Sequence, residues 1–508
     1  MSSISIDEKL KDPESVQNKE ILDVDVGDLS PKGVDAAFNY ALDVDYDEID
    51  PETERRLVRK IDCTIFPVMC LVYCIQFLDK TSNSYAVIMG LKEDLKMEGQ
   101  MYSWSGTAFY LGYLVFEFPA SLLLQRFPLS KTLCVFLVIW GFLLCMTSVA
   151  NYPGFIALRV LLGMMESAAS PGFILLTAQW YKRSEQQLRT SVWVAFNGLG
   201  QILGSCMAYG LAKRTSLPMR GWKLIFIICG VLAIFLGFVI LAVVPDNPFK
   251  AWFLTEEDRK LVVKRLRANK QGVGNNHFKL YQFKETMLDI RTWIMFVSSV
   301  LLNIPNGGIG TFSSLLIKGT MGYDTLQTLL MGLPAGACEF GGLIAFGFLS
   351  LFIHKRMVLA TITTCIALIG SCLLSFAGPP RAQLAGYYLL MVSPGAMIVM
   401  FAIISSNASG YTKKVTVGVI YLIGYCVGNL IGPQTFKAAD APEYMPAKNT
   451  MVGCYAATLV TFPALYYVNW RENKRRDQLA AEGKIEHRPN AEFEDLTDFE
   501  NLDFRYTL

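Results

Sequence analysis

Long apolar runs alternate with short polar segments along almost the whole chain. The hydrocarbon core of a bilayer is about 30 Å thick, so a helix needs roughly twenty apolar residues to cross it. Twelve such runs occur, at residues 61–77, 103–124, 132–150, 155–180, 190–211 and 222–244, and then at 293–317, 325–352, 357–376, 384–406, 415–436 and 451–470. Because 52% of the residues are hydrophobic and 18% are charged, we predict an all-α membrane protein with twelve transmembrane helices.

The two sets of six runs flank the most charged internal segment of the chain. Two six-helix halves around a polar linker are typical of transporters whose halves rock about a central site. We therefore predict five parts, namely an acidic cytoplasmic tail (1–60), an N-terminal six-helix bundle (61–245), a cytoplasmic linker (246–290), a C-terminal six-helix bundle (291–470) and a cytoplasmic tail (471–508). Both tails are short and polar, so we expect disordered regulatory segments.

Basic residues gather in the loops that fall on one side of the predicted bundle. They precede the first run, join the second run to the third and the fourth to the fifth, and follow the last run. Such loops are usually cytoplasmic, so both termini are expected in the cytoplasm. The exceptions are Lys213, Arg214, Arg220 and Lys223, which would lie outside.

Two regulatory features are expected in the cytoplasmic segments. Within the linker, Thr255 and Asp258 have the spacing of a helix-capping box, ahead of an amphipathic run at residues 259–267. A short helix along the inner membrane face is therefore expected. In the N-terminal tail, Lys9, Lys11 and Lys19 are candidate modification sites for the ubiquitin-dependent endocytic machinery.

Several other classes of protein are disfavoured by the same composition. The twelve cysteines lie almost entirely within apolar runs and show neither a CxxC pair nor metal-ligand spacing. No nucleophile triad or phosphate loop occurs, the net charge is only +2, and the basic residues cluster beside the apolar runs. We therefore expect no enzyme activity, no metal, no cofactor and no nucleic-acid partner.

Ionisable residues at membrane depth are costly and are functional candidates by default. The candidates are Asp79, Lys80, Glu117, Arg159, Glu166 and Glu339. The three histidines, His277, His354 and His487, fall in predicted loops or the tail, so carboxylates would have to carry any proton.

Arg159 and Glu166 are two helical turns apart and therefore face the same direction. Exposure to lipid would be unfavourable, so we predict that both face the bundle interior, where Glu166 could bind protons and Arg159 an anion. The alternative is a static ion pair that holds this helix to its neighbour.

Asp79, Lys80 and Asn83 follow the first apolar run and are placed at its outer end. Lys80 is the best candidate cation for an anionic substrate, and Asp79 is a plausible second proton site. The alternative is that both charged groups lie at the membrane interface. For Glu117 and Glu339 we favour a structural role in helix packing.

Polar stripes inside the apolar runs indicate where a ligand would bind. The segment from Asn303 to Gly310 contains Pro305 and Asn306 and is expected to be unwound or kinked. Four-residue spacing gives two further stripes, Asn197, Gln201 and Ser205 in the fifth run and Tyr421, Tyr425 and Asn429 in the eleventh. Hydrogen bonds between helices are an equally weighted alternative for each residue.

A long, ordered series of motifs resembles the anion:cation symporter branch of the major facilitators, in its fungal allantoate permease subfamily. The matching motifs include Phe77-Leu-Asp-Lys80, Phe109-Tyr-Leu-Gly-Tyr113, Arg159-Val-Leu-Leu-Gly163, Leu330-Met-Gly-Leu-Pro334, Gly432-Pro-Gln-Thr-Phe436 and the ending Phe504-Arg-Tyr-Thr-Leu508. The resemblance covers the chain from about Pro51 to its end. It implies two six-helix bundles and proton-coupled uptake of allantoate, ureidosuccinate and small dipeptides across the plasma membrane.

The resemblance also implies roles for single residues. Asp79 and Glu166 match the protonation sites of the symporter family, and Lys80 matches the arginine that holds the substrate carboxylate. A compact ammonium lacks the planar two-bond geometry of guanidinium, so Arg159 is a second candidate for that role. Alternative functions are a permease for another carboxylate, such as nicotinate, pantothenate or a sulfur amino acid, and a nutrient sensor with a transporter fold.

Overall fold

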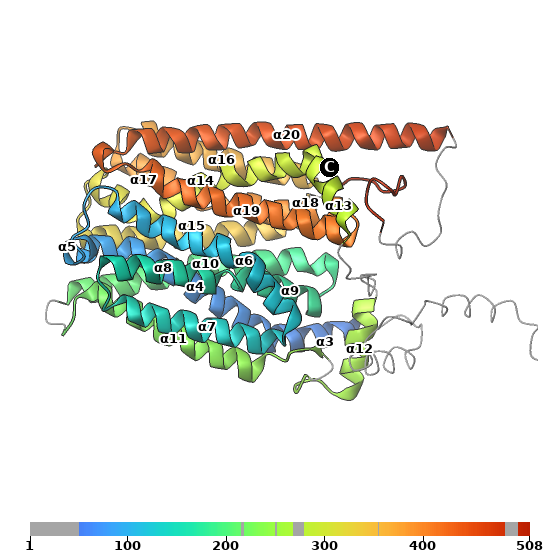
Figure 1. Cartoon of the computed structure of the whole chain (residues 1–508), viewed down its shortest axis with the longest axis horizontal. Coiled ribbons are helices and arrows are strands. Elements are labelled where there is room, and N and C mark those ends of the chain that lie inside the picture. Colours follow the sequence, from blue (N-terminus) through green and yellow to red (C-terminus); the bar gives the residue numbers. More distant parts are fainter. Residues whose placement is uncertain (1–49, 215–217, 249–250, 268–278, 354, 483–495) are drawn as a thin grey trace, which may run out of the picture.

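The computed structural model describes residues 50–508 apart from 215–217, 249–250, 268–278, 354 and 483–495. Residues 1–49 of the predicted acidic tail (1–60), with its three lysines, lie outside the described residues, as do all three histidines, His277, His354 and His487. Residues 51–60 of that tail are helical and belong to α3 (Pro51–Thr64), which corrects the expectation of disorder there. Every regular element in the described part of the chain is a helix. Figure 1 shows the long helices side by side, with α12 crossing one end of the bundle.

The helices of the first half match the first six apolar runs. They are α3 (Pro51–Thr64), α4 (Phe66–Ala86), the π-helical turn η1 (Val87–Leu91) and α5 (Lys92–Asp94), followed by α6 (Met101–Arg126), α7 (Leu129–Thr147), α8 (Tyr152–Glu166), α9 (Ala169–Trp180), α10 (Arg183–Lys213) and α11 (Gly221–Val243). The elements from α3 to α5 form one span, and α8 and α9 form another.

The second half repeats this arrangement after two linker helices. They are α12 (Glu256–Arg267) and α13 (Leu280–Leu288), followed by α14 (Ile290–Gly319), α15 (Thr325–Phe352), α16 (Arg356–Phe376), α17 (Pro380–Leu390), α18 (Pro394–Asn407), α19 (Tyr411–Thr435), the short η3 (Ala438–Asp440) and α20 (Met445–Ala481). Eleven spans in the described residues are long and apolar enough to cross a membrane. The more polar α10 supplies the twelfth long helix and packs on α4 and α15, which confirms the predicted fold.

The first span is longer than its apolar run. We predicted an end near residue 77, but the helix continues through Ala86 into η1, so Asp79 and Lys80 lie inside it and not at its outer end. Asp79 is fully buried and Asn83 is 5% exposed. The prediction was wrong because a hydropathy profile ends an apolar run at its first charged residues. Here neighbouring helices enclose those residues, so the helix continues past them.

Two spans are interrupted at corresponding positions of the two halves, the fourth and the tenth. The break between α8 and α9 precedes Pro171, and the break between α17 and α18 precedes Pro394. Proline has no backbone N–H, so neither residue can complete the helical hydrogen bond to the residue four positions earlier. We expected an unwound or kinked segment at Asn303 to Gly310, and the structure excludes unwinding there because α14 is one continuous helix through Pro305.

Close helix crossings hold the bundle together. A Cβ atom built on Gly163 of α8 would lie 1.9 Å from the carbonyl oxygen of Phe109 in α6. One built on Gly432 of α19 would lie 2.4 Å from the carbonyl oxygen of Ile304 in α14. Small residues let membrane helices approach this closely, so the glycines of α19 serve packing.

The two ends of the bundle differ. We call the end that carries α12, α13 and residues 496–508 the linker end, and the end that carries α5 and η3 the far end (Figure 1). At the far end the halves are joined directly: Tyr102 Oη donates to the carbonyl oxygen of Thr311 at 2.6 Å, and Ser84 Oγ donates to Ser314 Oγ at 3.0 Å. These contacts close the space between the halves there.

The structure explains one of the four basic residues that do not follow the predicted charge distribution. Arg220 Nη1 lies 2.7 Å from Asp94 Oδ1, and Trp222 Nε1 donates to Asp94 Oδ2 at 2.8 Å. One of the four cations is therefore neutralised by an acid of the first span.

The linker contains the helix α12, and this helix docks on the first half. Thr255 Oγ1 accepts from the backbone N–H of Asp258 at 3.2 Å, which completes the predicted capping box. Lys60 Nζ donates to Asp258 at 2.5 Å, and Arg265 pairs with Glu54 at 2.7 Å. Partial burial raises the pKa of Asp258, but hydrogen bonds from Lys60 and Thr255 outweigh it and leave the pKa below the usual value.

The C-terminal tail is ordered at its end, which corrects the expectation of disorder for residues 496–508. The side chain of Asp498 is completely buried. It lies 2.8 Å from Lys413 Nζ and 3.4 Å from Arg291 Nη1, and it accepts from Tyr506 Oη at 2.6 Å. Burial and the neighbouring Asp498 raise the pKa of Tyr506, so the phenol stays protonated and donates. Charge pairing to two helices of the second half, α14 and α19, therefore holds this polar segment in place.

Candidate functional site

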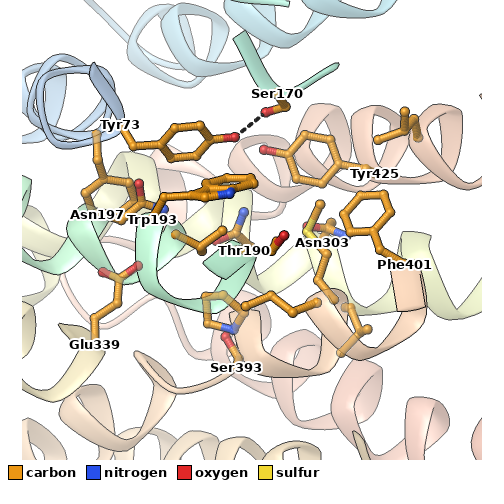
Figure 2. Close-up of a pocket in the computed structure, with 18 of the residues that line it drawn as sticks. Tyr73, Ser170, Thr190, Trp193, Asn197, Asn303, Glu339, Ser393, Phe401 and Tyr425 are labelled. Carbon is orange, nitrogen blue, oxygen red and sulfur yellow. Dashed lines mark hydrogen bonds between the residues drawn. The ribbon is translucent and has the colours of Figure 1, made fainter. Parts of the chain in front are cut away.

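A cavity of about 930 Å³ lies between the two halves (Figure 2). Six of the predicted site residues line it: Lys80, Glu166, Asn197, Gln201, Asn306 and Tyr425. The other five, Asp79, Asn83, Arg159, Tyr421 and Asn429, do not line it in this conformation. Helices of both halves contribute, so any movement of one half against the other changes the shape of the cavity.

The cavity extends to the linker end. Gln186 at the start of α10, Arg356 at the start of α16, and Asn501 and Phe504 of the C-terminal segment line its outermost part. Since direct contacts join the halves at the far end, access is from the linker end.

Lys80 is the cation of the cavity, and tyrosines surround it. Its Nζ donates to Tyr425 Oη at 3.2 Å and lies 5.0 Å from the centre of the Tyr110 ring. It forms no ion pair with a carboxylate in the described part of the chain. Lys80 lies within the first span and lines the cavity, which favours the substrate-binding role over the interface alternative. Cation–π contacts stabilise an ammonium without neutralising it, so Lys80 remains able to bind an anion.

Glu166 lies at the helix break. It is the last residue of α8 and is 3% exposed. Its Oε1 accepts from Gln76 Nε2 at 2.9 Å, whereas the buried Oε2 has no hydrogen-bond partner among the described residues. Just beyond the break, Ser170 Oγ accepts from Tyr73 Oη at 2.9 Å (Figure 2). A carboxylate with one free oxygen on a cavity wall is well placed to exchange a proton.

Asp79 and Arg159 lie behind the cavity, inside the first half. Asp79 Oδ2 accepts from Trp140 Nε1 at 3.1 Å, and the Arg159 guanidinium lies 5.2 Å from the centre of the Phe155 ring. Arg159 forms no ion pair with Asp79 or Glu166, so the static pair considered from the sequence is absent from the described residues. Asp79 Oδ1 and two guanidinium nitrogens have no hydrogen-bond partner there either.

The amide residues have mixed roles. Asn429 accepts from Asn306 Nδ2 at 3.0 Å and donates to the carbonyl oxygen of Tyr425 at 2.9 Å, so it links α14 and α19. Asn83 donates to Ser105 Oγ at 3.1 Å, and the ring of Tyr421 packs against Phe401. Asn429 and Asn83 therefore form hydrogen bonds between helices and do not line the cavity. Tyr421 does not line it either, and its buried hydroxyl has no hydrogen-bond partner among the described residues.

Three cavity residues were missed or given another role. Gln76 was not singled out, although an amide within an apolar run is a detectable signal. Arg356 donates to the carbonyl oxygen of Ala402 at 2.6 Å, a contact between distant segments that no local pattern predicts. Glu339 was interpreted as structural but lines the cavity, whereas Glu117 lies outside it and accepts from Cys426 Sγ at 3.5 Å.

Comparison with known proteins identifies this architecture. The family profile described as Major Facilitator Superfamily matches residues 69–433. This chain belongs to the major facilitator superfamily. As a major facilitator it is a membrane transport protein and not an enzyme.

Curated relatives of this major facilitator span nearly its whole length. It is 46% identical to the allantoate permease of Saccharomyces cerevisiae, over 94% of this chain and 93% of that protein. It is 43% identical to an uncharacterized transporter of Schizosaccharomyces pombe, over 95% and 98% of the two chains. A thiamine pathway transporter of Saccharomyces cerevisiae is 34% identical over 90% of this chain and 87% of that protein.

A solved structure supports the fold. The bacterial homolog of the human lysosomal transporter Spinster, in an inward-facing and unoccupied conformation, matches with a TM-score of 0.59 at 15% identity. The match covers 83% of this chain and 97% of the other. At this identity the likeness shows the major facilitator fold alone.

Proposed function

We propose that this transporter imports small organic anions together with protons, with allantoate as its principal substrate and ureidosuccinate and small dipeptides as further substrates. The observation that carries the proposal is an unpaired lysine, Lys80, on the wall of a cavity between the two halves. The similarity to an allantoate permease along 94% of the chain supports the choice of substrate.

The chemistry of allantoate suits the cavity. The molecule has one carboxylate and two ureido groups, so it needs one cation and several uncharged hydrogen-bonding partners. Lys80 and the hydroxyl of Tyr425 would bind the carboxylate, while Asn197, Gln201 and Asn306 offer amides to the ureido groups. Pockets of this kind fix a ligand through a few placed polar groups. The lysine ammonium does not require the planar two-bond geometry of a guanidinium group, so it can bind a carboxylate in more than one orientation.

Proton coupling would use the two buried carboxylates of the first half. Glu166 has a free oxygen next to the cavity, and Asp79 lies deeper, next to Arg159. When protons neutralise both acids, Lys80 is no longer attracted to Glu166 and can receive the substrate carboxylate. The loaded, neutralised site then permits the two halves to rock, and the cargo and the protons leave on the other side.

Sidedness follows from the distribution of charge. Basic residues such as Lys60, Lys182, Arg265 and Lys413 lie at the linker end, which we assign to the cytoplasm together with both termini. The structure is then inward-facing, and the plasma membrane is the proposed location. Ubiquitin-dependent retrieval through Lys9, Lys11 and Lys19 remains part of this proposal.

The test is uptake of labelled allantoate at pH 5 and pH 7.5 in fungal cells that lack their own permease. Ureidosuccinate, nicotinate and a dipeptide serve as competitors, and surface expression is measured in parallel. We expect faster uptake at the lower pH and inhibition by ureidosuccinate. Normal surface expression without uptake would refute allantoate as the substrate, and stronger inhibition by nicotinate would favour another carboxylate.

A further inference from the structure

Glu339 is a buried carboxylate on the wall of the cavity that the scheme above does not use. We propose that it is a specificity-determining residue, which accepts hydrogen bonds from the N–H groups of a substrate whose carboxylate is held by Lys80. This inference rests on the proposed function and deepens it. The site would then select carboxylates that carry a ureido or ammonium group away from the carboxylate.

The position of Glu339 is fixed by a close helix crossing. A Cβ atom built on Gly198 of α10 would lie 2.3 Å from the carbonyl oxygen of Gly336 in α15. Glu339 follows Gly336 by three residues and therefore lies on the same face of α15, toward α10. Figure 2 shows Glu339 on the opposite side of the drawn cavity from Ser170 and Tyr425. Two rigid helices thus hold the carboxylate at the wall.

The hydrogen-bonding capacity of Glu339 is not used within the described residues. Its side chain is 2% exposed, its Oε2 has no hydrogen-bond partner, and it forms no ion pair there. A buried acceptor without a donor is costly and is uncommon in native structures. A ligand that brings N–H groups would remove this cost, so binding would be selective for such ligands.

Neighbouring polar groups are already engaged with one another. Tyr85 Oη is 3.0 Å from Ser205 Oγ and donates to the carbonyl oxygen of Gln201 at 3.3 Å. Gln201 Nε2 donates to Tyr387 Oη at 3.2 Å. These residues form a network between α4, α10 and α17 that does not include Glu339, so the missing donor has to come from the contents of the cavity.

The charges of the cavity are separated in a way that matches such a substrate. Lys80 and Glu339 both line the cavity, but they form no ion pair with one another. One substrate molecule that places its carboxylate at Lys80 and an N–H group at Glu339 would give both side chains a partner. From the sequence, we gave Glu117 the same structural role as Glu339. Glu117 differs because it lies outside the cavity and already accepts a hydrogen bond from Cys426.

The experiment compares two small ligands of nearly equal shape, ureidoacetate and 4-oxopentanoate. They share a carboxylate and a carbonyl, but the second has CH₃ and CH₂ in place of the NH₂ and NH groups. Binding to the purified full chain is measured from the ligand-dependent rise in Tm. The variants are Glu339→Gln, which keeps the shape of the side chain, Lys80→Met, and Glu117→Gln as the matched control.

We expect the unmodified protein to bind ureidoacetate about tenfold to a hundredfold more tightly than 4-oxopentanoate, as for a hydrogen bond to a charged group. Glu339→Gln should reduce that ratio to within about threefold. Glu117→Gln should preserve the ratio, and Lys80→Met should weaken both ligands together.

The proposal is overturned if the ratio survives in Glu339→Gln, if both ligands bind equally to the unmodified protein, or if neither binds. The result of this experiment can be told apart from a failure of the proposed function. Absent allantoate uptake in cells would refute allantoate as the substrate, but the ratio for the two small ligands would still decide the role of Glu339.

Discussion

At the scale of single residues, burial without a charge partner distinguishes the groups of the cavity. Lys80 and Glu166 are held by uncharged neighbours, the tyrosines and Gln76, and not by an opposite charge. Ion pairs, in contrast, are formed toward the two ends of the bundle, where Asp498 pairs with Lys413 and Asp94 pairs with Arg220. A charge that is already neutralised cannot bind a substrate ion, so the unpaired groups of the cavity are the candidates that we propose for binding.

Replacing Lys80 should weaken substrate binding. We expect Lys80→Met to raise the half-saturating concentration for allantoate by about tenfold to a hundredfold, because a charge-assisted hydrogen bond is lost. Lys80→Arg should keep much of the affinity, since the charge remains. Initial uptake rates over a range of allantoate concentrations, normalised to surface expression, measure this. Unchanged kinetics in Lys80→Met would exclude contact with the substrate.

Replacing Glu166 should separate transport from proton coupling. Glu166→Gln keeps the hydrogen-bonding shape but cannot gain or lose a proton, so accumulation driven by a pH gradient should disappear while exchange of substrate across the membrane persists. Proteoliposomes loaded with unlabelled allantoate report both quantities. Accumulation that still follows the pH gradient would assign the proton to another group, with Asp79 as the next candidate.

At the scale of elements, close crossings and docked segments position the site. The crossing of α10 and α15 sets the wall that carries Asn197, Gln201 and Glu339. The C-terminal segment docks on the second half, where Arg476 donates to the backbone oxygens of Asp498 and Phe504 at 2.7 Å and 2.8 Å. Through Phe504 this segment also forms part of the cavity mouth.

The α10 and α15 crossing should tolerate no side chain. Gly198→Ala is expected to lower the stability of the purified protein by about 1–3 kcal/mol or more, because its Cβ would overlap the backbone of Gly336. Gly210→Ala in the same helix is the control, since its Cβ would meet nothing within 4 Å. Thermal unfolding in detergent compares the two. Equal Tm values would show that the crossing can widen without loss.

The docking of the C-terminal segment should depend on Asp498. Asp498→Asn removes a buried charge opposite Lys413 and Arg291, so the segment should detach and Tyr506, now 2% exposed, should become accessible to chymotrypsin. The control is Asp477→Asn, which breaks the exposed pair with Arg505 and should change little. Equal cleavage rates in the two variants would contradict this role.

At the scale of the whole molecule, the halves are joined at the far end and separated by the cavity toward the linker end. Alternating access requires the far-end contacts to break once per cycle. Ser84 Oγ and Ser314 Oγ, one from each half, are 3.0 Å apart and so report on this movement.

Locking the far end should stop transport. In the double variant Ser84→Cys and Ser314→Cys, oxidation should join the two halves and abolish allantoate uptake, and a reducing agent should restore it. Each single variant under the same oxidising conditions controls for the natural cysteines. Full uptake by the cross-linked protein would show that this contact does not open during the cycle.

The sequence by itself determined the fold class, the twelve spans and the linker helix. These properties depend on contiguous residues, because bilayer thickness acts on local hydropathy and capping acts within one turn. The ionisable residues at membrane depth were found for the same reason, and they include Lys80, Glu166 and Glu339.

Only the tertiary structure decided which of those residues face the cavity. Spacing shows that Tyr421, Tyr425 and Asn429 share a side of one helix, but not how that helix is rotated against its neighbours, and of the three only Tyr425 lines the cavity. The place of Glu339 on the cavity wall and the docking of the C-terminal segment could not be predicted either, since each depends on segments that are distant in sequence. Packing against neighbouring helices fixes the rotation of each helix, and it also buries polar residues that local hydropathy assigns to a loop.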